Sequence, residues 1–295
     1  MRKQFVKTIE ALMGKDQKLI LLLGDIGVFG FRNCFSDHPN RTFNIGILES
    51  ASIGVAAGMA SEGLIPVVHT IAPFLVERAF EQIKVDLGYQ KLGCNLVSVG
   101  ASYDYAALGC THHCPGDIGI LQYIPDMELV VPGSASEFDS LFSQAYANGN
   151  PTYFRLSERA HSESFSVKFG KANVLKRGKD LTVIAFGPAL EQAMDSVKNL
   201  DVTLLYYSTA NPFDAEALRQ CITPSRKLLI IEPFYVGTMT QKIVEAMRGE
   251  ALKISSIGVP RTFLRKYGSF KEHDISIGFT SKNIFNRAKA LIDEK

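Results

Sequence analysis

The chain has 295 residues, of which 46% are hydrophobic and 21% charged, and its formal net charge is +2, which predicts one large or two medium domains. Its scattered basic residues exclude nucleic-acid or membrane binding by charge alone, and no apolar stretch reaches the ~20 residues that cross a bilayer or forms a signal peptide. Five cysteines without a dense framework are typical of free thiols in a reducing compartment, so we expect a soluble cytoplasmic protein.

Short apolar runs alternate with helical patterns through the first half of the chain. Residues 3–13 carry apolar side chains at helical spacing, and Lys18–Leu23 is typical of a strand buried on both faces of a sheet. The strands expected after it are Phe43–Ile45, Pro66–His69, Leu96–Val99, Leu129–Val131 and Thr152–Leu156. The helices expected between them cover residues 49–62, 74–91, 117–123 and 136–148. This alternation predicts a doubly wound, mainly parallel α/β sheet.

Residues 162–179 lose this rhythm, because they are polar and rich in Gly and Lys, as in a linker or a hairpin at a domain boundary. A second, smaller α/β unit follows, with strands expected at Leu181–Ala185, Val202–Tyr206, Lys227–Ile231 and Ile254–Ile257. Its expected helices cover residues 189–199, 213–221, 238–248 and 282–293. We therefore predict two doubly wound α/β domains, at residues 1–165 and 180–295, joined by a linker at 166–179.

Glu49 is the most conspicuous candidate for chemistry. It stands alone among small and apolar residues at the start of the expected helix 49–62, where Gly54 and Gly58 leave room for a backbone or a flat ligand. The position follows a predicted strand, and open α/β sheets bind ligands at the carboxyl ends of their strands. By composition alone, an ordinary first-turn acid at a helix N-terminus fits this position as well.

Several motifs resemble those of transketolases in order and spacing. Phe43–Glu49 with the following Gly54–Gly58 resembles the family's pyrimidine-domain signature, and Phe74–Ile83 resembles its aromatic-bearing helix. The other matching segments are Gly109–His112, Asp117–Leu121 and Ile124–Pro132. The resemblance covers the whole chain but only the second half of a full-length transketolase. The chain is therefore most similar to the C-terminal subunit of a split transketolase, with a pyrimidine-binding domain followed by a C-terminal domain.

The resemblance implies that the cofactor is thiamine diphosphate. A carboxyl group bonded to the pyrimidine nitrogen N1′ lets the cofactor's own amino group act as a base toward the thiazolium C2 carbon, and the resemblance gives this role to Glu49. It also places Phe74 against the pyrimidine ring, and the loop with Asp25 and Ile26 against the cofactor rings. From the residues alone, a core phenylalanine and a strand-ending turn are the alternatives.

The resemblance further implies contacts with a small-molecule substrate. His112 matches the family histidine that faces the substrate, in a hydroxyl-binding or proton-transfer role. Arg2 matches a phosphate-binding arginine, and Arg159 lies one place from a second. Arg78 is expected either to bind an anionic substrate or to hold the catalytic acid, although an exposed helix arginine would look the same.

Metal binding is expected outside this chain. The run Cys110–Cys114 offers two cysteines and two histidines, but four ligands within five residues do not easily enclose a tetrahedral ion. The family holds the diphosphate through Mg²⁺ at a Gly-Asp-Gly motif, whereas here Gly24 and Asp25 are followed by Ile26. The resemblance thus implies an N-terminal partner subunit that carries Gly-Asp-Gly and the Mg²⁺ site, in a heterotetramer of two chains of each kind.

Four positions depart from the family's sugar-phosphate pattern. Gly100 stands where transketolases carry a histidine, Leu108 where they carry an acid, and Phe29 where a serine is expected. Glu158 occupies the place of the second phosphate-binding arginine. Each lost polar contact removes about 1–3 kcal/mol of substrate binding. We therefore expect a retained cofactor site beside an altered substrate pocket.

The main hypothesis is a subunit that helps to transfer a two-carbon ketol unit between a ketose donor and an aldose acceptor in carbohydrate metabolism. The altered pocket keeps a second reaction open, in which a 2-oxo acid is decarboxylated and its acyl group transferred, as in deoxyxylulose-phosphate synthases or 2-oxoacid dehydrogenase β subunits. A third hypothesis is a regulatory paralogue without activity. The intact Glu49 and Phe74 argue against this third hypothesis.

Overall fold

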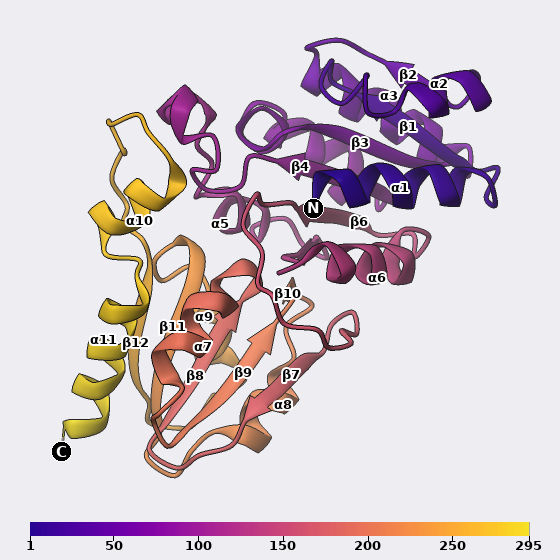
Figure 1. Cartoon of the computed structure of the whole chain (residues 1–295). Coiled ribbons are helices and arrows are strands. Elements are labelled where there is room, and N and C mark those ends of the chain that lie inside the picture. The colour runs from indigo at the N-terminus through magenta and orange to yellow at the C-terminus, as the bar shows by residue number, and fades with distance from the viewer. Residues whose placement is uncertain (295) are drawn as a thin grey trace.

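The computed structural model describes residues 1–294, which form two sheets with helices on their faces (Figure 1). The first sheet consists of β1 (Leu19–Leu23), β2 (Thr42–Asn44), β3 (Ile65–Ile71), β4 (Cys94–Val99), β5 (Glu128–Val130), β6 (Pro151–Arg155) and β10 (Thr209–Asn211). The second sheet consists of β7 (Ala172–Lys176), β8 (Leu181–Phe186), β9 (Val202–Tyr207), β11 (Lys227–Tyr235) and β12 (Lys253–Val259).

Both sheets are mainly parallel. The strand order of the first is β10-β5-β6-β4-β3-β1-β2, with β10 antiparallel to β5 and the other pairs parallel. The order of the second is β12-β11-β8-β9-β7, with β7 antiparallel to β9 and the other pairs parallel. Two doubly wound, parallel-dominated sheets confirm the predicted α/β fold class.

Strand β1 shows how the apolar runs generate a core on each side of the sheet. Leu19, Leu21 and Leu23 belong to a core that includes helices α1 (Arg2–Met13) and α6 (Ala135–Ala145). Ile20 and Leu22 belong to the opposite core, with helix α3 (Glu49–Ser61). Successive side chains of a strand point to opposite faces of the sheet, so a wholly apolar strand such as β1 is buried on both faces. Each such side chain contributes roughly 1.5–3 kcal/mol through burial.

The segment predicted as one helix over residues 74–91 is divided in the structure. Wide π-helical turns cover Phe74–Arg78 and Ile83–Tyr89, on either side of the short helix α4 (Phe80–Gln82). A π turn takes more residues than the 3.6 of an α turn, so the apolar spacing of an ordinary helix does not reveal it. Such turns are frequent at functional sites, and the first of these carries two of the predicted site residues.

Four elements are not predicted by the sequence: helix α2 (Arg32–Asp37), strands β7 and β10, and helix α10 (Phe270–Ile277). Strand β7 lies within the segment 166–179, expected as a linker, and forms the antiparallel edge of the second sheet. It has no buried run that would identify it. The short β10 pairs with β5, which is distant in sequence. The domain boundaries at 165 and 180 stay a prediction.

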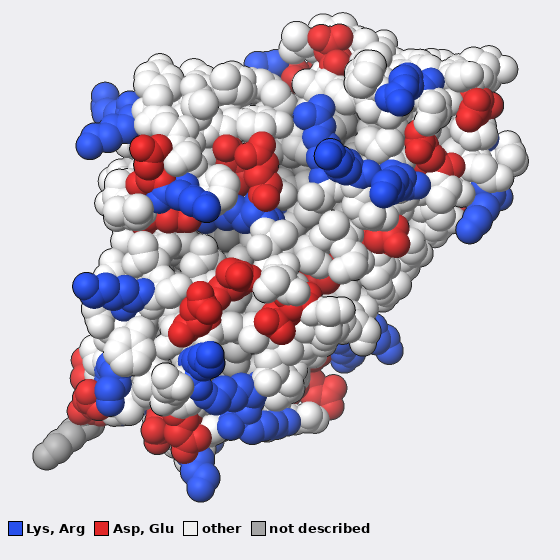
Figure 2. Space-filling model, in the orientation of Figure 1, with Lys and Arg blue, Asp and Glu red and all other residues white. Residues whose placement is uncertain are grey.

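The remaining helices cover the sheets at the expected places. They are α5 (Asp117–Leu121) in the first half of the chain, and α7 (Leu190–Val197), α8 (Ala215–Cys221), α9 (Thr240–Ala246) and α11 (Ser281–Asp293) in the second. Within residues 1–294 we find no helix with the length and apolar character needed to cross a membrane. Acidic and basic side chains alternate over the face shown in Figure 2, so this face has no extended field of one sign.

A buried ion pair in the first half of the chain also contacts the second half, through a hydrogen bond from its arginine. The Nε of Arg155, at the end of β6, lies 2.7 Å from Oδ2 of Asp117, the first residue of α5, and both side chains are buried. The Arg155 Nη2 also donates to the Ser102 hydroxyl at 2.7 Å and to the Pro233 carbonyl in β11 at 3.3 Å. The hydroxyl of Tyr153 donates to Asp117 at 2.9 Å. The first sheet is thereby fixed to a central strand of the second.

Replacing Asp117 with Ala leaves the buried guanidinium of Arg155 without its counter-charge. We expect the free energy of unfolding to fall by about 3–5 kcal/mol, measured by urea denaturation. The control is Asp293→Ala, which breaks the exposed pair with Lys289 and should cost no more than about 1 kcal/mol. Equal effects of the two substitutions would show that the buried pair does not stabilise the contact between the sheets.

Candidate active site

The candidate site lies at the carboxyl ends of β1 and β3, where the strand order reverses. Strand β2 lies on one side of β1 and β3 on the other, and open α/β sheets bind ligands at such a point. Gly24, the residue after β1, allows the two strand ends to approach, because a Cβ atom there would lie 2.9 Å from the side chain of Thr70. The ends of β1 and β3 therefore lie close together.

Asp25 and Ile26 form the turn after β1, at the predicted edge of the sheet. Asp25 has a left-handed backbone, with φ at 66°, and its N–H donates to Oδ1 of Asn44 at 3.0 Å. Nδ2 of Asn44 donates in return to Oδ1 of Asp25 at 3.2 Å. Asp25 is exposed and Ile26 half-buried. Asn44 is a site residue that sequence reasoning missed, although a lone amide at the end of an apolar strand was an available signal.

Glu49 is the first residue of α3 and is only 2% exposed. Its Oε2 accepts a 2.7 Å hydrogen bond from Nη1 of Arg78. Its Oε1 is buried and has no hydrogen-bond partner within residues 1–294. A buried polar atom without a partner costs about 1–3 kcal/mol. The site therefore favours a ligand that places a hydrogen-bonding group against Oε1.

Arg78 connects Glu49 to the aromatic side chains of the site. Its side chain is 49% exposed, and its guanidinium lies 4.5 Å from the centroid of the Phe74 ring, within the range of a cation–π contact. The Phe74 ring is half-buried and lies edge-on to the ring of His112, with 5.3 Å between centroids. Glu49, Arg78, Phe74 and His112 thus form one continuous line of contacts.

His112 lies on a short turn whose other potential metal ligands are dispersed. The Nδ1 atom of His112 lies 3.0 Å from the hydroxyl of Thr111. Cys110 is exposed, whereas Cys114 is buried, with its Sγ atom 3.6 Å from Glu77. Throughout the described residues 1–294, no cluster of three or more His, Cys, Asp or Glu side chains is placed to hold a metal ion.

The two arginines predicted to bind substrate have different surroundings. Arg2 is exposed at the first residue of α1. Arg159 is buried, and its Nη1 lies 2.9 Å from Oδ1 of Asp274 in α10. Its guanidinium also stacks 4.6 Å from the centroid of the Tyr103 ring. Arg159 therefore binds the second half of the chain, which sequence reasoning did not anticipate, and its role toward substrate stays a prediction.

Three of the departures from the family pattern lie in the loops that follow β1 and β4. Gly100 has φ at 81°, and a Cβ atom there would lie 2.8 Å from the ring of Tyr105. Tyr105 thus fills the space beside Gly100, a contact that sequence reasoning missed because it forms within an irregular loop. Leu108 is 52% exposed and Phe29 is 82% exposed, so neither is part of the core.

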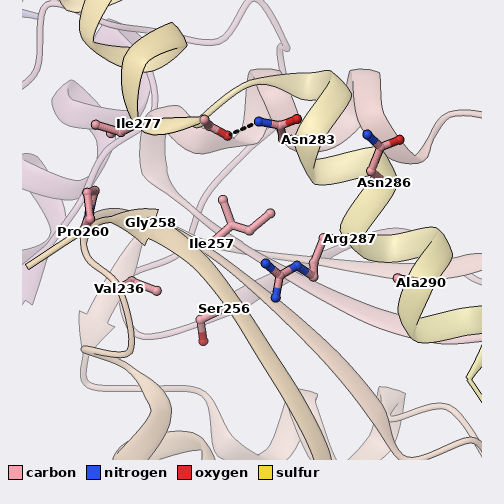
Figure 3. Close-up of a pocket in the computed structure, with 11 residues that line it drawn as sticks. Val236, Ser256, Ile257, Gly258, Pro260, Ile277, Asn283, Asn286, Arg287 and Ala290 are labelled. Carbon is pink, nitrogen blue, oxygen red and sulfur yellow. Dashed lines mark hydrogen bonds between the residues drawn. The ribbon is translucent and has the colours of Figure 1, made fainter.

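The second half of the chain contains a separate open groove. It lies between the end of β12 and helix α11, has a volume of about 440 Å³, and is lined by residues that include Ser256, Asn286 and Arg287 (Figure 3). Arg287 donates from Nη1 to the hydroxyl of Ser255 at 3.2 Å. None of the site residues predicted from the sequence lines this groove. The predicted site is therefore confined to the first sheet and its loops.

Comparisons with known proteins agree with this arrangement. The family model described as "Transketolase, pyrimidine binding domain" matches residues 1–162, and "Transketolase, C-terminal domain" matches residues 170–284. A 33.6 kDa protein of the fasciation locus of Rhodococcoides fascians is 33% identical over 98% of this chain and 93% of its own length.

One further relative is named as a transketolase subunit, and one solved structure has a similar fold. One subunit of the apulose-4-phosphate transketolase from Phocaeicola vulgatus is 29% identical over 88% of this chain and 87% of its own length. A solved structure described as a split gene transketolase, inactive beta4 tetramer, has a TM-score of 0.87 and 24% identity, covering 99% of this chain and 97% of its own. That structure shares the fold of the whole chain.

The buried His69 in β3 makes stability depend on pH. The His69 ring is closely packed, since a Cβ atom at Gly27 would lie 3.2 Å from it, and the Nδ1 atom of His69 lies 2.8 Å from the Val97 carbonyl. Burial lowers the pKa of His69 to about 4. In the unfolded chain, His69 takes up a proton near pH 6.5, which the folded chain does not bind until about pH 4. The contribution of His69 to the free energy of unfolding is therefore fully present above about pH 6.5 and is lost as the pH drops toward 4.

We therefore expect the free energy of unfolding to rise with pH from 4 to 6.5, with up to about 1.4 kcal/mol per pH unit arising from His69. His69→Gln should lower this slope relative to the wild type, as measured by urea unfolding at a series of pH values. Parallel slopes for the two proteins would contradict the assignment to His69.

Proposed function

Because this chain belongs to the transketolase family, we propose that it is one subunit of a thiamine-diphosphate-dependent enzyme that transfers a two-carbon ketol unit from a ketose to an aldose. The observation that supports this most strongly is the buried Glu49, whose Oε1 lacks a partner within residues 1–294. Its place at the point of strand reversal fits a cofactor that reaches the site from the carboxyl ends of the strands.

In this proposal Glu49 holds the aminopyrimidine of the cofactor in its active form. When bound, thiamine diphosphate supplies a stabilised carbanion at the thiazolium C2 carbon. Glu49 shares a proton with the pyrimidine nitrogen N1′ through Oε1, while Arg78 holds Oε2 from the solvent side. Because the Glu49 side chain is almost wholly buried, water does not compete for that proton.

The neighbouring side chains complete the site in this proposal. Phe74 packs against the pyrimidine ring, and the turn with Asp25 and Ile26 borders the cofactor from the end of β1. His112, edge-on to Phe74, binds a substrate hydroxyl or moves its proton. Arg2 and Arg159 stay candidates for an anionic end of the substrate, although Asp274 already pairs with Arg159.

We infer that a second chain carries the diphosphate and Mg²⁺ half of the site. Gly24 and Asp25 do not continue into a Gly-Asp-Gly motif. Ile47 and Leu48, immediately before Glu49, are 65% and 58% exposed, and adjoining exposed apolar side chains are typical of an interaction surface. An N-terminal partner subunit that covers them, in a heterotetramer of two chains of each kind, would enclose Glu49 and complete the site.

Glu49→Gln removes the shared proton and preserves the volume of the side chain. We expect turnover by the reconstituted pair of subunits to fall by about 100- to 10,000-fold, with an unchanged circular dichroism spectrum. Glu62→Gln is the matched control, because Glu62 is exposed at the other end of the same helix. Near-normal turnover by Glu49→Gln would remove this acid from the mechanism.

The choice of donor separates ketol transfer from acyl transfer. We expect the reconstituted pair to turn over ketose donors in the presence of an aldose, and this chain alone to show no turnover. The measurement is the rate of product formation with a ketose phosphate, an unphosphorylated ketose and pyruvate. Activity with pyruvate alone would support decarboxylation and acyl transfer instead, a reaction that the altered edge at Gly100 and Tyr105 keeps open. Activity without a partner would contradict the shared site.

A further inference from the structure

We propose that Tyr105 determines substrate specificity, with its phenol hydroxyl binding a hydroxyl group of the ketose donor beside His112. This inference rests on the proposed function, because it places a ketose in the site. It adds a substrate contact from a residue that no motif of the chain contains. Three features of the structure carry it: the space that the ring fills, the partners that the hydroxyl lacks, and the distance to His112.

The ring of Tyr105 occupies a position that only a glycine at residue 100 leaves open. A Cβ atom at Gly100 would lie 2.8 Å from both Cδ2 and Cε2 of Tyr105 and 3.4 Å from Ile71. Two non-bonded carbon atoms do not lie 2.8 Å apart, so the Cβ atom of any other residue at position 100 would displace the Tyr105 ring. The ring therefore lies beside Gly100, the residue that follows β4, and Ile71 at the end of β3 lies on the same side of Gly100.

The hydroxyl of Tyr105 is available to a ligand. It makes no hydrogen bond within residues 1–294, and its oxygen is not fully enclosed although the side chain is half-buried. The deeply buried tyrosines differ, since the hydroxyls of Tyr103, Tyr153, Tyr206 and Tyr207 each donate to an oxygen of the protein. Because its oxygen is not enclosed and has no protein partner within the described residues, this hydroxyl can form a hydrogen bond with a ligand in place of water.

Tyr105 also continues the line of contacts that begins at Glu49. Its ring centroid lies 6.5 Å from that of His112, which in turn contacts Phe74. Burial raises the pKa of Tyr105, and the negative charges of Glu158 and Asp104 act in the same direction, against Arg2. The phenol therefore stays protonated and neutral at physiological pH. A neutral phenol hydroxyl can both donate to and accept from a sugar hydroxyl.

The test compares three variants of the reconstituted pair. Tyr105→Phe removes the hydroxyl and keeps the ring, Tyr105→Leu removes both, and Tyr123→Phe is the control because Tyr123 is exposed. We expect Tyr105→Phe to raise KM for the ketose donor roughly 5- to 30-fold while kcat stays within about twofold, because a uniform binding contact changes KM alone. The melting temperature of this chain should not change in Tyr105→Phe or Tyr123→Phe.

A series of ketose donors, each lacking one hydroxyl, then identifies the group that is bound. For one member of the series, the wild type and Tyr105→Phe should have the same KM, because the contact is already absent. If Tyr105→Phe has the wild-type KM with every donor, the hydroxyl binds no substrate and the inference is wrong. Impaired activity of Tyr105→Leu alone would then show only that the Tyr105 ring is needed for packing. Failure of the proposed function would give a different result, because the wild-type pair would then turn over no ketose at all. That result would contradict both the proposed ketol transfer and the role of Tyr105.

Discussion

Glu49 brings a carboxylate into a part of the molecule from which water is excluded, and the rest of the site is arranged around that constraint. Arg78 donates a 2.7 Å hydrogen bond to Oε2 of Glu49 from the solvent side, whereas Oε1 has no donor among residues 1–294. A buried charge with only half of its hydrogen bonds made is costly. Such a cost is typical of a functional site, where a ligand supplies the remaining bond.

The two halves of the chain contribute unequally to this site. The first sheet supplies the strand ends that carry Asp25, Glu49 and Phe74. The second half fixes the surrounding loops, because Asp274 binds Arg159 and the Pro233 carbonyl accepts from Arg155. The second half of the chain therefore contacts the loops around the candidate site.

The sequence predicts the fold, and it makes the candidate site residues recognisable, because both depend on local signals. Buried parallel strands such as β1 are continuous apolar runs, and the isolated acid Glu49 is conspicuous in a helix of small residues. The edge strand β7 and the short β10 have no such signal, since their stability comes from pairing with distant strands. The ion pair of Arg159 with Asp274 and the contact of Tyr105 with Gly100 likewise arise from tertiary packing. Periodicity contains no information about such contacts.

In the assembled enzyme, we expect the free oxygen of Glu49 to meet the pyrimidine edge of thiamine diphosphate. The most direct measurement is a crystal structure of this chain with its partner subunit, thiamine diphosphate and Mg²⁺. We expect Oε1 of Glu49 to lie within about 2.6–3.2 Å of the ring nitrogen N1′, with Arg78 still bound to Oε2. A structure in which another group meets N1′ and Glu49 remains turned away from the ring would contradict it.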